Sequence, residues 1–358
     1  MTATDVSLTV GVILGAGLLS YPIGALLRLP YMLVLVGVGA LLGPSVLDLI
    51  DVPLTSTGAQ VLLTLGVSFI LFYGGLHLSV RVLRQVAFGL GMLVIPGVII
   101  TAVVCGLVAA LVFDVPVTTG LLIGAVLAPT DPAILISLFR RMGLRPKLEQ
   151  TIVAESALND PTGAVLALTF LGVVVTGDGL GAGSLVNFAT ELGISAGLGI
   201  VFGVLLALVM SHSRLGLWRE SAGIAVLAIV TLTFFTVTEA GAESGYLGPF
   251  VAGLIVGNMD RLRLGMHTDH ERDMRSLSDI MVIFVFVVLG ANLPFAAIAD
   301  NWLPALAVLA VLILVARPLV VLVCLLPDRR GAWTRQELLF MAWTRATGVV
   351  PAALAGIV

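Results

Sequence analysis

The chain has 358 residues, of which 59% are hydrophobic and 11% are charged, and its formal net charge is -3. Ordinary soluble domains carry roughly 25% charged residues, so a water-soluble fold of this size could not cover so much apolar surface. The composition excludes a soluble enzyme or nucleic-acid-binding protein. It predicts a protein embedded in the lipid bilayer. In such a chain the basic residues gather in the loops on one side of the membrane. No cofactor is expected.

Apolar runs of about 20 residues recur along the chain, each long enough to cross a hydrocarbon core of roughly 30 Å. The first begins near Leu8 after an acidic leader, which favours a retained helix over a cleaved signal peptide. We therefore predict an all-α membrane protein of about twelve transmembrane helices, placed at residues 8–27, 31–47, 59–78, 86–113, 117–138, 149–176, 187–211, 221–242, 246–258, 280–298, 302–326 and 336–358.

The basic residues fall on alternate connections between these spans, as the positive-inside rule requires. Of the 18 Lys and Arg residues, all except Arg317 and Arg345 follow this pattern, and the opposite connections carry acids only. The pattern predicts a multi-pass protein of the cell membrane with its N-terminus outside. The most charged connection, residues 260–279, is expected to be a solvated cytoplasmic loop.

Five charged residues lie well inside predicted spans, away from the span ends: Arg317, Arg345, Asp131, Glu155 and Asp160. Each costs roughly 2.5 to 3.5 kcal/mol at a helix centre unless it is paired. Such residues mark ion or proton pathways more often than they only join helices, so they are the first candidates for a functional site.

The fifth span contains the segment Ala128-Pro129-Thr130-Asp131-Pro132. Both prolines lack an N–H group and crowd the carbonyl four residues earlier, so the helix is expected to break here. Broken helices at membrane depth line cavities or are covered by protein, and their ends offer carbonyls and dipoles to ions. Asp131 then either offsets the positive ends of half-helices or enters the ion path, and we favour the first role.

The sixth span contains a second cluster, in which Ser156 and Asp160 share one helix face while Glu155 and Asn159 share another. Carboxylate, hydroxyl and backbone oxygens are hard ligands suited to Na⁺, K⁺ or Li⁺. A buried carboxylate also binds a proton more readily than an exposed one, so a cation and a proton compete for the same charge. Such competition, with access from alternating sides, is sufficient for exchange.

Arg317, in the eleventh span, needs a buried anion, and Glu155 is its expected partner, which leaves Asp160 to titrate. The segment from Trp343 to Gly348 interrupts the twelfth span much as the prolines interrupt the fifth. Matching breaks in two halves of a chain indicate an inverted repeat with a site at the membrane midplane.

At these residues the chain resembles the monovalent cation/proton antiporter superfamily, especially its sodium/proton exchanger branch. The resemblance rests on Thr130-Asp131-Pro132, Glu155-Ser156, Asn159-Asp160 and Arg317-Pro318. It implies that Asp160 binds the cation or proton, that Ser156, Thr130 and Asn159 assist, and that Glu155 pairs with Arg317. It also implies electroneutral exchange, because electrogenic relatives carry an aspartate at the position of Asn159.

The resemblance further implies a homodimer with an elevator-like core. The expected division is dimerisation-domain helices at 1–84, core helices at 85–178, a linker helix at 179–214, dimerisation-domain helices at 215–300 and core helices at 301–358.

The sequence departs from the pattern of this superfamily in two places. Arg345-Ala346-Thr347-Gly348 replaces the Gly-Leu-Arg-Gly stretch of many relatives, and the chain stops at Val358 where the repeat predicts a thirteenth helix, so we expect a truncated sequence.

Alternative functions remain open at this point. Sodium-coupled uptake of an organic solute occurs on related inverted-repeat folds and predicts side chains for the organic group, whereas the polar residues here gather round one carboxylate. A channel should show a repeated filter or rings of like charge, and the sequence has neither. Na⁺/H⁺ exchange is the leading hypothesis, followed by exchange of K⁺ or Li⁺.

Overall fold

The computed structural model describes residues 3–27, 29–130, 145–177, 182–211, 222–241, 245–258, 268–328 and 331–344. All regular secondary structure in these ranges is helical, which confirms the predicted all-α class. The elements are α1 (Ala3–Leu27), α2 (Tyr31–Leu42), α3 (Thr57–Leu76), α4 (Val80–Gln85), α5 (Ala87–Val94), α6 (Pro96–Val112), α7 (Val117–Leu127), α9 (Pro146–Thr176), α10 (Ala182–Ser211), α12 (Ala222–Glu239), α13 (Leu247–Gly257), α14 (Thr268–Ala291), α15 (Phe295–Val311), the π-helix η3 (Leu312–Ala316), α16 (Arg317–Leu325) and α17 (Arg335–Trp343).

Seven helical segments in the described ranges are long and apolar enough to cross a membrane. Four shorter apolar helices, α2, α7, α12 and α13, accompany them. At 1.5 Å per residue the 11-residue α7 spans only about 16 Å, roughly half of a hydrocarbon core. The chain is therefore a multi-pass membrane protein, and α7 alone is too short to cross the membrane.

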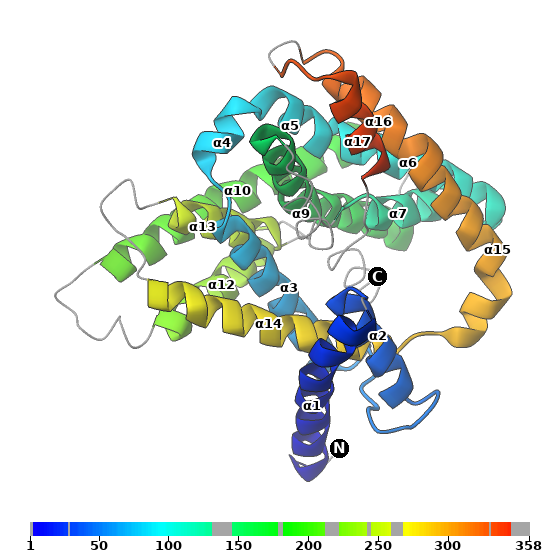
Figure 1. Ribbon diagram of the computed structural model, residues 1–358, viewed down its shortest axis with the longest axis vertical. Helices are drawn as coiled ribbons and strands as arrows, with labels where there is room; N and C mark the ends of the chain where they lie inside the picture. The colour runs from blue at the N-terminus through cyan, green and yellow to red at the C-terminus, as the bar shows by residue number, and fades with distance from the viewer. Residues whose placement is uncertain are drawn as a thin grey trace.

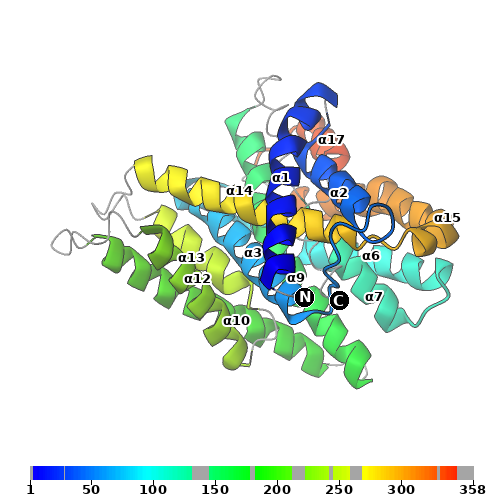
Figure 2. The ribbon, with the colours of Figure 1, turned by 90° about the horizontal axis from the view of Figure 1, so that it is seen from below.

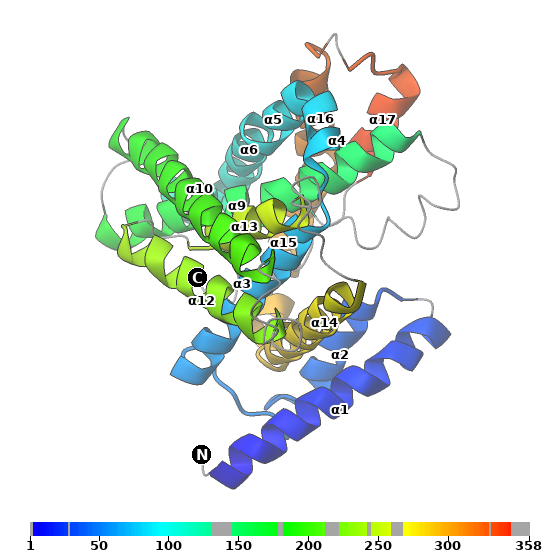
Figure 3. The same cartoon turned by 90° about the vertical axis from the view of Figure 1, so that its left-hand side faces the viewer.

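The helices pack in two groups that meet at α9. In the first group α14 contacts α1, α2 and α3, while α13 packs between α3 and α10. In the second, α6 contacts α7, α15 and α16, and α5 lies against α9 and α16. Figure 3 shows α1, α2 and α14 at one end of the molecule and α5, α6, α16 and α17 at the other. Because α9 also touches α3, α10 and α13, it lies at the boundary between the groups (Figure 1).

The helices of the first group also form a flank of their own. Figure 2 shows α10, α12 and α13 side by side on the flank opposite α15. Contacts between each pair of these three helices agree with that view. The arrangement leaves the second group, which includes α7, as a separate bundle, and α9 lies between the two groups.

Glycines bring α6 and α7 into backbone contact. A Cβ added at Gly124 of α7 would collide with the Ala102 carbonyl of α6, and one added at Gly106 would meet the backbone of Leu121. Small residues at membrane helix interfaces allow this kind of close approach. The contact holds α7 close against α6, and the functional site begins where α7 ends.

Two predicted boundaries are wrong. The predicted loop 260–279 is helical from Thr268, because α14 extends beyond the apolar stretch and its Arg275 and Asp279 lie one turn apart with opposite charges. The tenth and eleventh spans meet at residues 292–294 instead of 299–301, since α15 begins at Phe295 and absorbs Asp300 with a kink at Asn301.

The fourth predicted span, 86–113, is two helices. It bends at Ile95, between α5 and α6, because Pro96 cannot donate a backbone hydrogen bond inside a helix and starts a new one at its first position. The bend stays within one apolar stretch, so the predicted crossing remains a single span from Ala87 to Val112.

Candidate functional site

The fifth predicted span breaks where its prolines predict. Helix α7 ends at Leu127, and residues 128–130 continue as non-helical backbone. Pro129 packs against α9 at Gly163, where an added Cβ would overlap the proline ring. A residue with a side chain at position 163 would push Pro129 away, so this glycine allows the broken segment to lie directly on α9.

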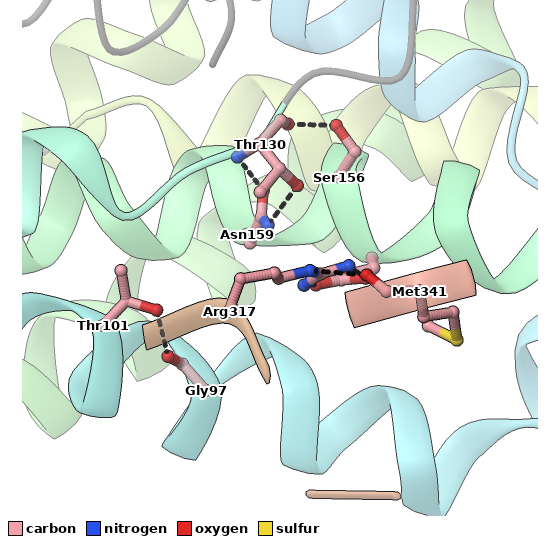
Figure 4. A network of polar contacts seen from close by, with 8 residues as sticks. Gly97, Thr101, Thr130, Ser156, Asn159, Arg317 and Met341 are labelled. Carbon is pink, nitrogen blue, oxygen red and sulfur yellow. Dashed lines mark hydrogen bonds and ion pairs between the residues drawn. The ribbon is translucent and has the colours of Figure 1, made fainter. Parts of the chain in front are cut away.

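Thr130, at the break, is bound by one turn of α9 (Figure 4). Asn159 Oδ1 accepts a hydrogen bond from the Thr130 backbone N–H at 3.2 Å, and Asn159 Nδ2 donates to Thr130 Oγ1 at 2.8 Å. Ser156 Oγ donates to the Thr130 carbonyl. All three residues are buried, so these bonds satisfy backbone groups that the broken helix leaves open.

Asp160 belongs to the same turn of α9. It follows Asn159 directly and lies four residues after Ser156, so its side chain leaves the helix on the face that Ser156 shares. Asp160 is half-buried, and its Oδ1 atom lies in the protein interior. Helix α9 continues through Pro161 without ending, and the turn therefore keeps its three polar side chains in fixed register.

Glu155 and Arg317 form a buried ion pair between α9 and α16. Arg317 Nη2 donates to Glu155 Oε2 at 3.0 Å, and Nη1 donates to Oε1, so the guanidinium binds both carboxylate oxygens. Each side chain is 3% exposed. Arg317 Nε donates in addition to the Met341 carbonyl of α17 at 2.9 Å. One arginine thus joins three helices, and its charge is compensated inside the membrane region.

A π-turn aims Arg317 at its partners. The five residues of η3 precede Arg317, and the Arg317 backbone N–H bonds the Leu312 carbonyl five residues earlier. Pro318 follows, and a proline has no N–H for the Leu314 carbonyl and would clash with it in a regular helix. The wider turn relieves that clash, and π-turns of this kind are frequent at functional sites.

The site helix is also attached at its beginning. Lys147 Nζ lies 3.7 Å from the centre of the Trp333 ring, and Trp333 Nε1 donates to Asp328 at 3.1 Å. Arg145 approaches Glu337 of α17 at 3.5 Å, although Arg145 is 71% exposed and such a contact contributes little. The start of α9 is therefore tied to the connection between α16 and α17, on the same helices that the ion pair joins.

The structure brings together Thr130, Ser156 and Asn159, places Asp160 in the same turn, and joins Glu155 to Arg317. Asp131 and Arg345 lie outside the described residues, as does most of the second predicted break, where α17 ends at Trp343. Sequence reasoning missed the Met341 carbonyl and Thr101 of α6, a buried residue beside the ion pair. A backbone carbonyl has no side-chain signature, and a single threonine in an apolar helix is common.

A multi-pass helical protein with a short apolar helix that ends in non-helical backbone beside buried carboxylate oxygens belongs, by architecture, with secondary membrane transporters. The sequence profile of the transmembrane sodium/hydrogen exchanger family matches residues 12–358. The chain therefore belongs to the sodium/hydrogen exchanger family, which is a family of transporters and not of enzymes.

Individual relatives agree with this assignment. The K(+)/H(+) antiporter NhaP of Alkalimonas amylolytica is 31% identical over 354 residues, covering 97% of this chain and 59% of that protein. The probable Na(+)/H(+) antiporter 2 of Methanocaldococcus jannaschii is 28% identical over 333 residues, covering 88% of this chain and 75% of that protein. The chain thus spans less than two thirds of the length of the NhaP relative.

A solved structure shares the fold over almost the whole chain. The sodium proton antiporter MjNhaP1 of Methanocaldococcus jannaschii, solved at pH 8, superposes with a TM-score of 0.83 at 25% identity. The match covers 99% of this chain and 86% of that structure. The predicted antiporter fold is thereby confirmed.

Proposed function

We propose that the protein exchanges a monovalent cation for protons and that Asp160 is the carboxylate that binds them in turn. The observation that carries this proposal is the clamp of Ser156 and Asn159 on Thr130, which fixes broken backbone beside Asp160. The neighbouring candidates on the same helix are occupied or uncharged. Glu155 is bound through both oxygens by Arg317, and the Asn159 amide does not ionise.

The ligands for the cation are oxygen atoms of this turn and of the break. We assign the Asp160 carboxylate, the Ser156 hydroxyl and the Thr130 carbonyl, all of which are hard ligands that suit Na⁺, K⁺ or Li⁺. Ser156 Oγ uses its hydrogen on Thr130 and retains lone pairs for a cation. Asn159 contributes by holding Thr130 in place. In this proposal Asp131, next to Thr130 in sequence, offsets the positive ends of the half-helices.

One titrating carboxylate makes the exchange electroneutral. A monovalent cation replaces one proton at Asp160, so the loaded site has the same charge in both directions of the cycle. Curated relatives are named for K⁺/H⁺ and for Na⁺/H⁺ antiport, which supports the class of substrate. We take Na⁺ as the leading substrate, with K⁺ and Li⁺ as the other cations of the same chemistry.

Alternating access is proposed to occur by an elevator movement of the second group of helices against the first. Support comes from the packing, in which α6 contacts each of the core helices α5, α7 and α16, and α9 lies at the boundary. The proposal includes the dimerisation, linker and core segments predicted from the sequence, and a homodimer. It also places the protein in the cell membrane with its N-terminus outside. The basic connections of the sequence support that orientation.

The test is transport in proteoliposomes that contain a pH dye, with Na⁺, K⁺ or Li⁺ added outside. We expect cation-driven proton movement that is insensitive to membrane potential, and its loss in Asp160→Asn. Asp300→Asn makes the same change at an exposed aspartate of α15, so it is the matched control and should transport like the parent. Proton movement that persists in Asp160→Asn would overturn the site, and no movement with any cation would overturn the antiport function.

A further inference from the structure

A small cavity lies behind the Thr130 clamp, on the side of the ion pair. Its volume is about 10 Å³, which is close to the minimum that holds one water molecule. Five polar residues line it together with apolar walls from α5, α6 and α16: Thr101, Thr130, Glu155, Asn159 and Arg317. All five are buried, so the cavity is polar although it lies inside the membrane region.

The hydrogen-bonding groups around this cavity are only partly used within the described part of the chain. Asn159 has two amide hydrogens, and among the described residues one of them is bonded, to Thr130. Arg317 has five N–H groups, and three of them are bonded there, to Glu155 and Met341. Thr101 Oγ1 donates to the Gly97 carbonyl at 2.9 Å and keeps its lone pairs as acceptors. Buried donors and acceptors of this kind are normally paired, directly or through ordered water.

We propose that this cavity binds one structural water molecule that connects the ion pair to the cation site. The water accepts hydrogen bonds from Asn159 and Arg317 and donates to Thr101 and to an oxygen of Glu155 or Thr130, which is within the two to four partners of a typical buried water. The inference rests on the proposed function, because it makes the water part of the support for the Thr130 clamp.

A second cation is excluded by the same lining. The guanidinium of Arg317 and the amide hydrogens of Asn159 present positive charge to the cavity, and a cation there would gain no anion that Arg317 does not already bind. In the view of Figure 4 the Arg317 side chain runs between the helix of Thr101 and the helix of Asn159. A neutral molecule that both donates and accepts is what this arrangement fits.

Thr101 is therefore a positioning residue for transport. Thr101 is not one of the proposed cation ligands. It orients the water molecule, and that water accepts the second amide hydrogen bond of Asn159. Losing one such hydrogen bond weakens the arrangement at the cation site, and we expect the half-saturating cation concentration to rise about 2- to 10-fold while maximal transport changes little.

The test compares Thr101→Val, which keeps the shape and removes the hydroxyl, with Thr101→Ser, which keeps the hydroxyl. The KM for the cation is measured in proteoliposomes, and melting temperature is measured in detergent. A raised KM in Thr101→Val and a restored KM in Thr101→Ser, at similar melting temperatures, supports the proposal. A KM equal to that of the parent in both variants overturns it.

A second readout does not depend on folding of the variants or on transport. A cryo-EM reconstruction of the unmodified protein that resolves waters should show density within hydrogen-bond distance of Thr101 Oγ1 and Asn159 Nδ2. A dry cavity would overturn the water site. If the parent carries no antiport, the proposed function fails, while the density still decides whether the water is bound.

Discussion

Arg317 is the side chain on which most of the site depends, because it joins α9, α16 and the Met341 carbonyl of α17. A buried ion pair gives little net stability compared with apolar residues of the same size, but removal of one partner leaves an uncompensated charge. The bidentate geometry also requires the planar guanidinium, so lysine is a poor substitute.

We expect Arg317→Ala to lower the free energy of unfolding by about 3–5 kcal/mol and to abolish transport. The double variant Glu155→Leu with Arg317→Met should regain most of the stability, because it removes both charges. Denaturant unfolding in detergent measures both effects. Arg335→Ala removes an exposed arginine from α17 and should change stability by about 0.5 kcal/mol or less. Equal losses in the single and double variants would contradict a compensated pair.

At the scale of elements, the π-turn before Pro318 determines which way Arg317 points. Replacing Pro318 with alanine restores an N–H for the Leu314 carbonyl, so the turn can close to a regular helix and rotate Arg317 away from Glu155. We expect Pro318→Ala to lose transport although every charged residue is retained. Pro304→Ala, which removes the proline inside α15, is the matched control and should keep transport. Activity in Pro318→Ala equal to that of the parent would show that the turn is not needed.

Gly163 tests the contact between α9 and the broken segment. The side chain in Gly163→Ala would displace Pro129, move Thr130 and weaken cation binding. Gly193→Ala is the control, because an added Cβ at Gly193 of α10 meets nothing within 4 Å. Alanine there should leave transport intact and stabilise the helix by up to about 1 kcal/mol. Transport assays and melting curves distinguish the two, and unchanged cation affinity in Gly163→Ala would contradict the packing account.

Some features of these helices could be predicted from the sequence, and others could not. The break after Leu127 could be predicted because proline acts locally, and the charged residues of α9 and α16 stood out because charge is rare inside a membrane. The placement of Thr101 and of the Met341 carbonyl beside the ion pair depends on packing between helices distant in sequence. Periodicity and composition do not report such packing.

At the scale of the whole molecule, the proposed orientation has a direct test. Cys105 and Cys324 are buried, so a cysteine added at an exposed position can be labelled selectively. An impermeant maleimide added to intact cells should label Thr55→Cys, on a connection predicted to be outside, and should label Gln336→Cys only after permeabilisation. The reverse pattern would place the N-terminus inside.

The two groups of helices make α9 the element that carries the site and also adjoins the other group. An elevator movement would therefore carry Asp160 along with the Thr130 clamp and the ion pair, because all three are fixed on α9. The division into a moving core and a dimerisation domain stays a prediction from the sequence.

The central claim is that a cation and a proton compete for Asp160, and proton release on cation binding tests it most directly. Purified protein in weakly buffered detergent with a pH dye is mixed with Na⁺, K⁺ or Li⁺, with choline as the control cation. We predict release of up to about one proton per chain for the transported cation, and none in Asp160→Asn, because one carboxylate exchanges one charge. Proton release that is undiminished in Asp160→Asn would contradict the account and place the competing group elsewhere.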